Sequence, residues 1–286
     1  MKSNILKLFL PTAITLALTI VAPAQKNDAN PLGTFSFDFK RLGKDPAEQV
    51  QALKKIGFSG ATLTFRDNFK AFSKEVKKGD FEIYAAHQAI YIGKKTKLNT
   101  QQISRQVDQV KSVDADFWFI ILEKNGDKAS TDLLVETINK VADICAKKGV
   151  KCVLYPHDAT LMESAEEAIE ILKKTKRKDL YISFHLCHEI RAGNGNRLEA
   201  VAKKVKPYLR LASISGADVK YVDNSQDWSK TIQPLDKGTY DTSKFIKALK
   251  SIDYKGPVIL HTFALHKVKA DHHQRSFKKY QELFSK

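Results

Sequence analysis

The chain has 286 residues, of which 43% are hydrophobic and 28% charged, so it is too apolar for a disordered protein and long enough for a sizeable core. Its three cysteines are too few for a disulfide framework. Its formal net charge of +16 would suit an anionic partner, but the lysines occur in nearly every predicted helix. Such a distribution is typical of solvated outer faces, and we expect no nucleic-acid partner.

The N-terminal segment, residues 1–24, has the pattern of an export signal. Lys2 gives it a positive start, and an almost unbroken apolar stretch extends from Leu8 to Val21. The tripeptide Ala22-Pro23-Ala24 then offers the small residues that a signal peptidase accepts. We therefore expect residues 25–286 to form the mature domain, periplasmic or secreted, with no membrane anchor after cleavage.

Eight short apolar runs follow, and longer amphipathic segments separate them. The runs, which we predict to be strands, are Thr34–Phe39, Gly60–Phe65, Phe81–His87, Asp116–Leu122, Val150–Tyr155, Leu180–Leu186, Leu209–Ser215 and Pro257–Phe263. Seven helical segments lie between them, and an eighth closes the chain at Asp271–Phe284. The repeat of about 30 residues, with no change of amino-acid composition that would mark a second domain, predicts a single (β/α)8 TIM barrel. A doubly wound open sheet is the alternative, but no Gly-x-Gly-x-x-Gly turn follows the first run.

The ends of the helical segments carry clear signals. Asp45 precedes Pro46, which places a capping carboxylate before a proline at the first helical position. Gly57 and Gly149 follow lysine-rich segments, where a left-handed residue ends a helix. These signals support the assignment of helices between the strands.

The cysteines and one tryptophan have open interpretations. Cys145, Cys152 and Cys187 lie in apolar helix- or strand-like positions, which favours buried thiols; a Cys145–Cys152 bridge is the alternative. Trp118 lies in the fourth run between two phenylalanines, so core packing is favoured over a sugar-binding platform.

Polar residues gather where the predicted strands end. In parallel barrels the chemistry occurs at the carboxyl ends of the strands. Five of the eight histidines are found there, namely His87, His157, His185, His188 and His261. Imidazole titrates near neutral pH and binds metals, so this placement predicts a site for proton transfer or for a metal. His272 and His273, by contrast, begin the last helical segment, and we expect them to be exposed.

The second half of the chain resembles a known family. The motifs that carry the resemblance are Leu154-Tyr155-Pro156-His157, Phe184-His185-Leu186-Cys187-His188, Ile214-Ser215-Gly216-Ala217-Asp218, Ile232-Gln233-Pro234-Leu235-Asp236-Lys237-Gly238 and Gly256-Pro257-Val258-Ile259-Leu260-His261. They are similar to those of the sugar phosphate isomerase/epimerase family, the xylose isomerase-like TIM barrels, of which this chain resembles a divergent exported member.

The resemblance implies isomerisation or epimerisation of sugars around a divalent metal held by Glu, Asp, His and Glu. These ligand positions fall here on Tyr155, His185, Ser213 or Ser215, and His261, so none is retained in type. The two accompanying histidines of the family are retained as His157 and His188. Imidazoles in place of carboxylates favour a Zn²⁺-like ion or no metal, so a divalent metal stays possible and its identity open.

These observations predict an exported carbohydrate-active enzyme that moves a proton in an isomerase, epimerase, lyase or hydratase reaction. Because Gly216 is the only glycine at the end of the seventh run, a phosphate site is poorly supported, and we expect a small non-phosphorylated sugar or keto-sugar. The candidate catalytic residues are His185, His188 and Glu189. The candidate substrate-binding residues are Tyr155, His157, His261, His87, Glu123 and Gln233. The alternative is a non-catalytic sugar- or glycan-binding barrel that has lost the family's metal site.

Overall fold

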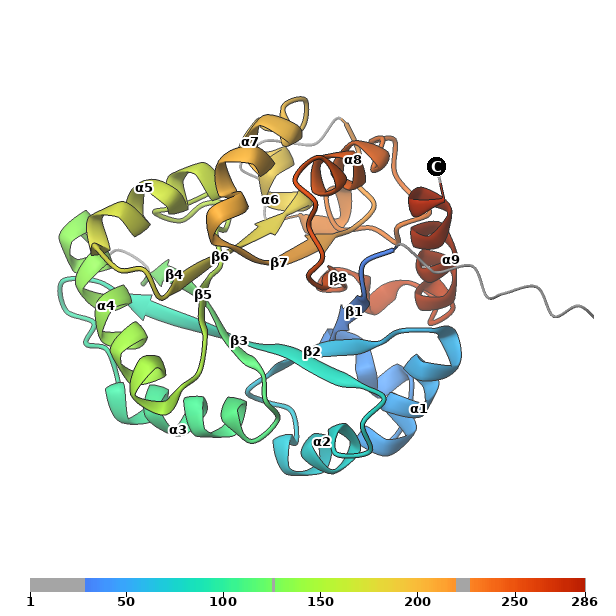
Figure 1. Ribbon diagram of the computed structural model, residues 1–286, viewed down its shortest axis with the longest axis horizontal. Coiled ribbons are helices and arrows are strands. Elements are labelled where there is room, and N and C mark those ends of the chain that lie inside the picture. Colours follow the sequence, from blue (N-terminus) through green and yellow to red (C-terminus); the bar gives the residue numbers. More distant parts are fainter. Residues whose placement is uncertain (1–28, 125–126, 220–226, 286) are drawn as a thin grey trace, which may run out of the picture.

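Parallel strands pair in chain order and close into a barrel in the computed structural model, which describes residues 29–124, 127–219 and 227–285 (Figure 1). Over these ranges the eight strands are β1 (Leu32–Phe35), β2 (Gly60–Thr64), β3 (Glu82–Ile92), β4 (Asp116–Glu123), β5 (Cys152–Leu154), β6 (Leu180–His185), β7 (Leu209–Ile214) and β8 (Val258–Leu260). Closure comes from β8 pairing with β1, where Leu32 is opposite Val258. The predicted (β/α)8 barrel is confirmed, and the open-sheet alternative is excluded.

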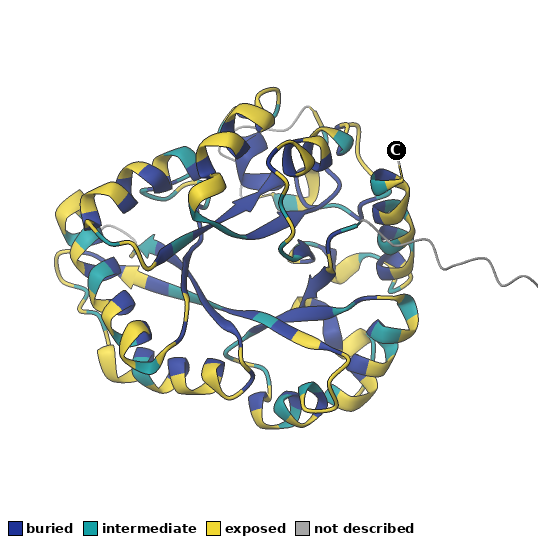
Figure 2. Cartoon of the chain, in the orientation of Figure 1, coloured by how far each residue is buried: buried dark blue, intermediate teal, exposed yellow. Residues whose placement is uncertain are grey.

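Helices form a ring around the strands (Figure 1). In the described part of the chain they are α1 (Pro46–Ile56), α2 (Phe69–Val76), α3 (Thr100–Lys111), α4 (Thr131–Lys148), α5 (Ala165–Thr175), α6 (Leu186–Arg191), α7 (Leu198–Val205), α8 (Ser243–Ser251) and α9 (His272–Phe284). Short 3-10 helices are η1 (Ser36–Arg41), η2 (Lys206–Tyr208), η3 (Trp228–Lys230) and η4 (Leu265–Lys267). Figure 2 shows that the helices expose their outer faces and bury those that meet the strands.

The helix-end signals act as predicted. The Asp45 side chain accepts a hydrogen bond from the Glu48 N–H, and Pro46 is the first residue of α1. Gly57 and Gly149 end α1 and α4 with φ angles of 116° and 70°, a region that glycine enters at little cost.

The first strand is shorter than its sequence pattern suggests. The prediction extended it to Phe39, but β1 ends at Phe35 and the chain turns into η1. The Thr262 hydroxyl donates to the Phe35 carbonyl at 3.1 Å. A side-chain hydrogen bond thus takes the place of the next backbone hydrogen bond of the sheet. The alternating phenylalanines at 35, 37 and 39 mimic a strand, but the last two belong to η1.

The prediction that His272 and His273 are exposed is wrong, because both side chains are fully buried. The first turn of α9 packs under η1, where Asp38 Oδ2 lies 2.7 Å from His272 Nε2. The ring of Phe58 covers His273 with a centroid distance of 6.1 Å. A contact between the first and last β/α units of the barrel therefore removes this helix start from solvent.

Side chains inside the barrel form a small apolar cluster that supports the mouth above it. Its buried members are Phe35, Ala85, Trp118, Ile120, Val153, Tyr155, Leu211 and Ile259. Trp118 is fully buried, as favoured from the sequence, and its indole N–H donates to the Ser183 hydroxyl at 2.8 Å. All three cysteines are buried free thiols, so the Cys145–Cys152 bridge is not formed.

No helix in the described ranges combines the length and the apolar character needed to cross a bilayer. The predicted export signal, residues 1–24, lies outside the described residues.

Candidate active site

The five strand-end histidines meet at the carboxyl end of the barrel. We call the group the mouth cluster; its members are His87, Tyr155, His157, His185, His188 and His261. The Tyr155 and His185 rings are stacked, with centroids 4.0 Å apart and planes 5° apart. His157 and His188 lie 4.2 Å apart, and His87 lies 5.1 Å from Tyr155. The convergence expected from strand topology is thus present in the structure.

Access to the mouth cluster differs from one member to another. His185 and His188 are 1% exposed and His261 is 4% exposed, whereas His87 and His157 are only partly buried. A molecule that enters from the solvent would therefore reach His87 and His157 before the deeper rings.

A short hydrogen-bond chain fixes the proton on His185. The Ser183 hydroxyl accepts from the Trp118 indole, lies 3.0 Å from the Leu154 carbonyl and lies 2.8 Å from His185 Nε2. All three contacts are satisfied when Ser183 donates to Leu154 and His185 Nε2–H donates to Ser183. His185 Nδ1 is then an unprotonated nitrogen, and it is buried without a hydrogen-bond partner.

The Tyr155 hydroxyl lies between two histidines, 3.0 Å from His261 Nε2 and 3.5 Å from His188 Nε2. On the other side of the His188 ring, Nδ1 accepts the Asp158 N–H at 3.3 Å. His157 Nδ1 lies 2.7 Å from the Asp158 carbonyl, to which it donates. His157 Nε2 is therefore left as a hydrogen-bond and proton acceptor.

The imidazoles of the mouth cluster are neutral at neutral pH. Burial, reinforced by neighbouring histidines, lowers the pKa of His87 and of His261 to about 3. The same causes hold the pKa of His185 and of His188 well below the usual range. Uncharged rings are the form that donates lone pairs to metals, and they also make the site electrically neutral.

An aromatic side chain that the sequence interpretation did not include closes one flank of the mouth cluster. The Trp228 ring lies 5.2 Å from His157 and 5.4 Å from His188. The Arg191 guanidinium stacks 3.9 Å from the Trp228 centroid and donates to Asp158 Oδ2 at 2.9 Å. Trp228 lies in a segment without strand or helix periodicity, so no sequence signal placed it near the histidines.

Two exposed phenylalanines border the opposite flank. Phe37 is 37% exposed and Phe263 is 50% exposed, and their rings lie 5.3 Å apart. The Phe37 ring lies 6.4 Å from His261 and 6.5 Å from His87. Exposed aromatic faces beside polar groups are typical of sites that pack against the C–H faces of sugars.

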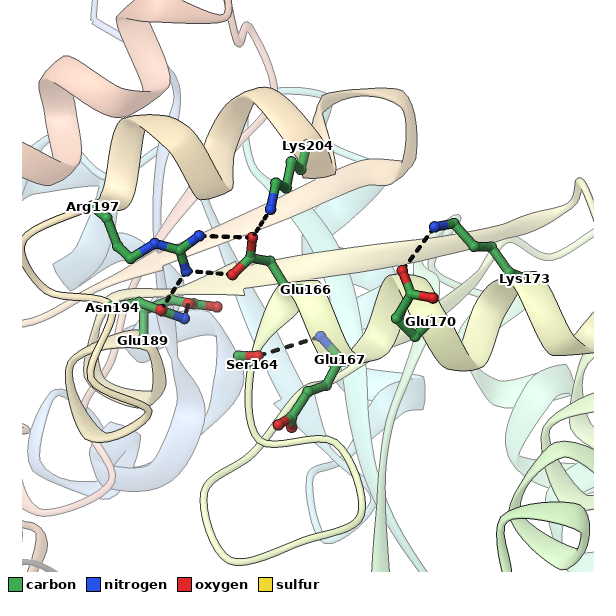
Figure 3. A network of polar contacts seen from close by, with 9 residues as sticks. All are labelled: Ser164, Glu166, Glu167, Glu170, Lys173, Glu189, Asn194, Arg197 and Lys204. Carbon is green, nitrogen blue, oxygen red and sulfur yellow. Dashed lines mark hydrogen bonds and ion pairs between the residues drawn. The ribbon is translucent and has the colours of Figure 1, made fainter.

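Three candidate residues from the sequence make their contacts outside the mouth cluster. Glu189 is 1% exposed and accepts from the Ala165 N–H at 2.7 Å and from Asn194 Nδ2 at 2.6 Å. Figure 3 shows Glu189 beside Asn194 and Arg197, in a network that continues to Glu166 at the start of α5. The position therefore suits a structural carboxyl group that accepts hydrogen bonds at the start of α5.

Glu123 and Gln233 are engaged elsewhere as well. Glu123 accepts from the Ala129 N–H at 2.7 Å and pairs with Lys128 at 3.0 Å. Gln233 donates to Asp218 Oδ2 at 3.0 Å, and its backbone bridges to Gly216. These contacts organise loops beside the barrel.

The family model described as "Xylose isomerase-like TIM barrel" matches residues 50–280. The chain belongs to this family. Solved structures described as a xylose isomerase-like TIM barrel fusion protein and as a xylose isomerase domain containing protein are similar in fold to this one at 13% and 14% identity. The search of curated protein sequences found no match.

Three solved structures illustrate this likeness. The IolI protein with a bound zinc atom has a TM-score of 0.72 and 15% identity, over 89% of this chain and 98% of that chain. The 3-keto-D-glucoside 4-epimerase YcjR from E. coli has a TM-score of 0.70 and 14% identity, over 88% and 99%. The probable 3-DHS dehydratase AsbF from Bacillus anthracis has a TM-score of 0.68 and 14% identity, over 86% and 97%.

The metal that xylose isomerase-like barrels typically hold can be tested against these residues. His185, His188 and His261 each offer one ligand nitrogen, and the three nitrogens lie within 4.8 Å of one another. The partnerless Nδ1 of His185 is a ready ligand atom. Three neutral imidazoles suit Zn²⁺ or a similar borderline ion, whereas Mg²⁺ and Mn²⁺ prefer oxygen ligands. The ligand types therefore fit a metal of a different class from the family's carboxylate set. Because Nδ1 of His188 and of His261 accepts a backbone N–H, from Asp158 and from Phe263, their Nε2 atoms carry protons that a bound ion would displace.

Proposed function

We propose that this protein is a carbohydrate-active enzyme that moves a proton at a carbon beside the carbonyl of a non-phosphorylated sugar or keto-sugar. The observation that carries the proposal is the mouth cluster itself, in which five neutral imidazoles and one phenol converge where barrel enzymes perform chemistry. Isomerases, epimerases, lyases and hydratases share this proton-transfer step.

In this proposal one group of residues holds a metal ion and another residue accepts the proton. His185, His188 and His261 would hold a Zn²⁺-class ion, which when bound polarises a carbonyl oxygen. His157 takes the proton, because its Nδ1–H is bound by the Asp158 carbonyl and its Nε2 is free to accept. Since His157 is partly exposed, a substrate can reach it without a rearrangement of the deeper rings.

The flanking aromatic rings support a sugar substrate. Trp228 on one side and Phe37 with Phe263 on the other offer apolar faces to the C–H groups of a carbohydrate ring. The neutral histidines between them offer hydrogen bonds to hydroxyl groups. Similar solved barrels include proteins described as 3-keto-D-glucoside 4-epimerase, D-allulose 3-epimerase and L-ribulose 3-epimerase, which favours the same substrate class here.

A non-catalytic sugar-binding barrel is the second candidate. The observation that favours it is the replacement of carboxylates by Tyr155, His185 and His261 at positions where the family holds its metal. Imidazoles whose pKa burial has lowered to about 3, as in His87 and His261, are also weak bases. Such a protein would bind a sugar and release it unchanged.

A panel of free ketoses, aldoses and 3-keto-glycosides distinguishes the two candidates. Each sugar is incubated with the protein and an excess of Zn²⁺, Co²⁺ or Mn²⁺, and proton NMR follows binding and conversion. We expect a new isomer, epimer or dehydrated product from at least one sugar. Saturable binding without product in any metal would support the binding module, and neither binding nor product would contradict both.

Export is also part of the proposal, and its support is the pattern of residues 1–24. N-terminal sequencing of the protein recovered from the periplasm or medium of a secreting host tests it. A mature chain that begins near Gln25 is expected, and retention of an intact N-terminus inside the cell would contradict export.

A further inference from the structure

A second group of metal-ligating side chains lies away from the mouth cluster, between the first and the last β/α unit. It consists of Asp38 on η1 and of His272 and His273, the first two residues of α9; we call it the clasp cluster. The exposed fractions are 4% for Asp38 and zero for both histidines. In Figure 1, α9 lies next to α1, where the end of the chain returns to its beginning.

The contacts within the clasp cluster leave several polar atoms without partners. His272 Nε2 lies 2.7 Å from Asp38 Oδ2, and His273 Nε2 lies 3.5 Å from Asp38 Oδ1. Asp38 Oδ1, Nδ1 of His272 and both nitrogens of His273 are buried without a hydrogen-bond partner. Buried polar atoms are almost always paired, because burial otherwise removes their bonds to water without replacement. A fully buried imidazole whose Nδ1 has no hydrogen-bond partner, and whose Nε2 approaches Asp38 Oδ1 at 3.5 Å, therefore requires an explanation.

The geometry suits a small cation. One ligand atom from each of the three residues lies within 4.8 Å of the other two. Ligands at about 2.0–2.1 Å from a tetrahedral Zn²⁺ are about 3.3 Å from one another. The two Asp38–histidine separations, 2.7 Å from Oδ2 to His272 Nε2 and 3.5 Å from Oδ1 to His273 Nε2, lie on either side of that value.

The chemistry of the ligand set agrees with the geometry. Two imidazoles and one carboxylate suit a borderline divalent transition metal, and Asp38 offsets one of the ion's two positive charges. Arg41 lies on the same short helix as Asp38. Its guanidinium donates to the carbonyls of Leu265 and His266, which hold it against η4.

We propose that Asp38, His272 and His273 form a buried structural site for a divalent transition metal that clasps the first β/α unit to the last helix. The site is separate from the mouth cluster and does not depend on the proposed enzymatic function. Since all three side chains are closed to solvent, the ion stabilises the fold and does not meet substrate.

Zn²⁺ binding to the chelator-treated full-length protein tests this site. Isothermal titration gives the stoichiometry, and thermal unfolding gives a readout that needs no activity. We expect two equivalents in the wild type and one in His273→Gln. The change removes the 3.5 Å contact of His273 Nε2 with Asp38 Oδ1, and circular dichroism verifies the fold. The matched control is His266→Gln, an exposed histidine of the neighbouring η4, which should bind as the wild type does.

A variant of the mouth cluster, His185→Ala with His261→Ala, isolates the clasp cluster. It should keep one equivalent, and Zn²⁺ at a hundredfold excess over Kd should raise its Tm by about 5–10 °C. The same excess of Zn²⁺ should not change the Tm of the triple variant that combines His185→Ala, His261→Ala and His273→Gln. If His273→Gln and Asp38→Asn, both folded, bind as much Zn²⁺ as the wild type, the clasp site is refuted. Water then fills the space beside His273. A wild type that binds one equivalent of Zn²⁺, lost in the mouth variant, would also refute it, while leaving the proposed function intact.

Discussion

The hydroxyl of Ser183 lies 2.8 Å from Nε2 of His185, and this contact decides which nitrogen of His185 keeps its lone pair. The Trp118 indole and the Leu154 carbonyl complete the partners of Ser183, so the proton of His185 is held on Nε2. A residue of the barrel interior thereby prepares a ligand atom at the mouth.

Removal of this hydroxyl should weaken metal binding without touching a ligand. In Ser183→Ala the His185 tautomer is no longer fixed, and we expect affinity for Zn²⁺ at the mouth to fall about 10–100-fold. The Trp118 N–H also loses its partner, which should cost about 1–3 kcal/mol of unfolding free energy. Titration and urea unfolding measure both effects, and Ser251→Ala on α8 serves as control. Unchanged affinity would show that Ser183 does not orient His185.

The proposed proton acceptor can be removed with little change in shape. His157→Gln should lower kcat about 10²–10⁴-fold, because the change removes the nitrogen that is proposed to take the proton. The fold should be preserved, since His157 is only partly buried. The exposed His266→Gln is the matched control. A kcat within twofold of the wild type would transfer the proton-accepting role to another residue.

Glu189 provides a contrasting case. Its carboxylate accepts from Ala165 at the start of α5 and from Asn194, so Glu189→Gln should lower the free energy of unfolding by about 1–2 kcal/mol. Activity per folded molecule should stay at the wild-type level. Glu170→Gln, at an exposed glutamate of α5, should change neither the free energy of unfolding nor the activity. Loss of turnover in a folded Glu189→Gln protein would restore Glu189 to the catalytic set.

The free energy of unfolding should depend on pH over the range in which the histidines of the mouth cluster are neutral in the fold but protonated in the unfolded chain. The pKa of His87 and of His261 is about 3 in the fold and 6.5 without it, because burial disfavours the charged ring. As the pH falls below about 6.5, these histidines bind protons in the unfolded chain but not in the folded protein. The free energy of unfolding therefore falls by about 1.4 kcal/mol per pH unit for each of the two histidines. The loss continues until the pH approaches 3.

Glu189 acts in the opposite direction over part of this range. Burial raises its pKa to about 7 from 4.5, so between those values the fold binds a proton that the unfolded chain lacks. One carboxyl against at least two histidines leaves a net loss on acidification. Urea unfolding of the metal-free protein at pH 7.5, 6.5, 5.5 and 4.5 measures it. A flat profile between pH 6.5 and 4.5 would contradict the buried neutral imidazoles.

The sequence was sufficient for the barrel because its signals are local. Strand and helix periods, the Asp45–Pro46 cap and the glycines at 57 and 149 each depend on neighbours in the chain. The convergence of His185 and His261 was predictable as well, because a parallel barrel brings all carboxyl ends of its strands to one rim.

The remaining features depend on contacts that no local pattern encodes. Asp38 meets His272 across 234 positions of sequence, so the burial of the α9 start could not be read from its own composition. Glu189 follows His188 directly, yet α6 directs its side chain to α5 and away from the mouth. Trp228 reaches His157 from the three-residue 3-10 helix η3, which is too short to give a periodic signal in the sequence.

The central claim is that the mouth cluster moves a proton of a sugar, and solvent exchange tests it most directly. The metal-loaded protein is incubated in D₂O with the sugars that it binds, and NMR follows the carbon-bound protons next to each carbonyl. The account predicts that the wild type replaces one such proton with deuterium, and that His157→Gln slows the replacement at least a hundredfold. Sugar bound at saturation with every carbon-bound proton retained, in all metals tried, would contradict it.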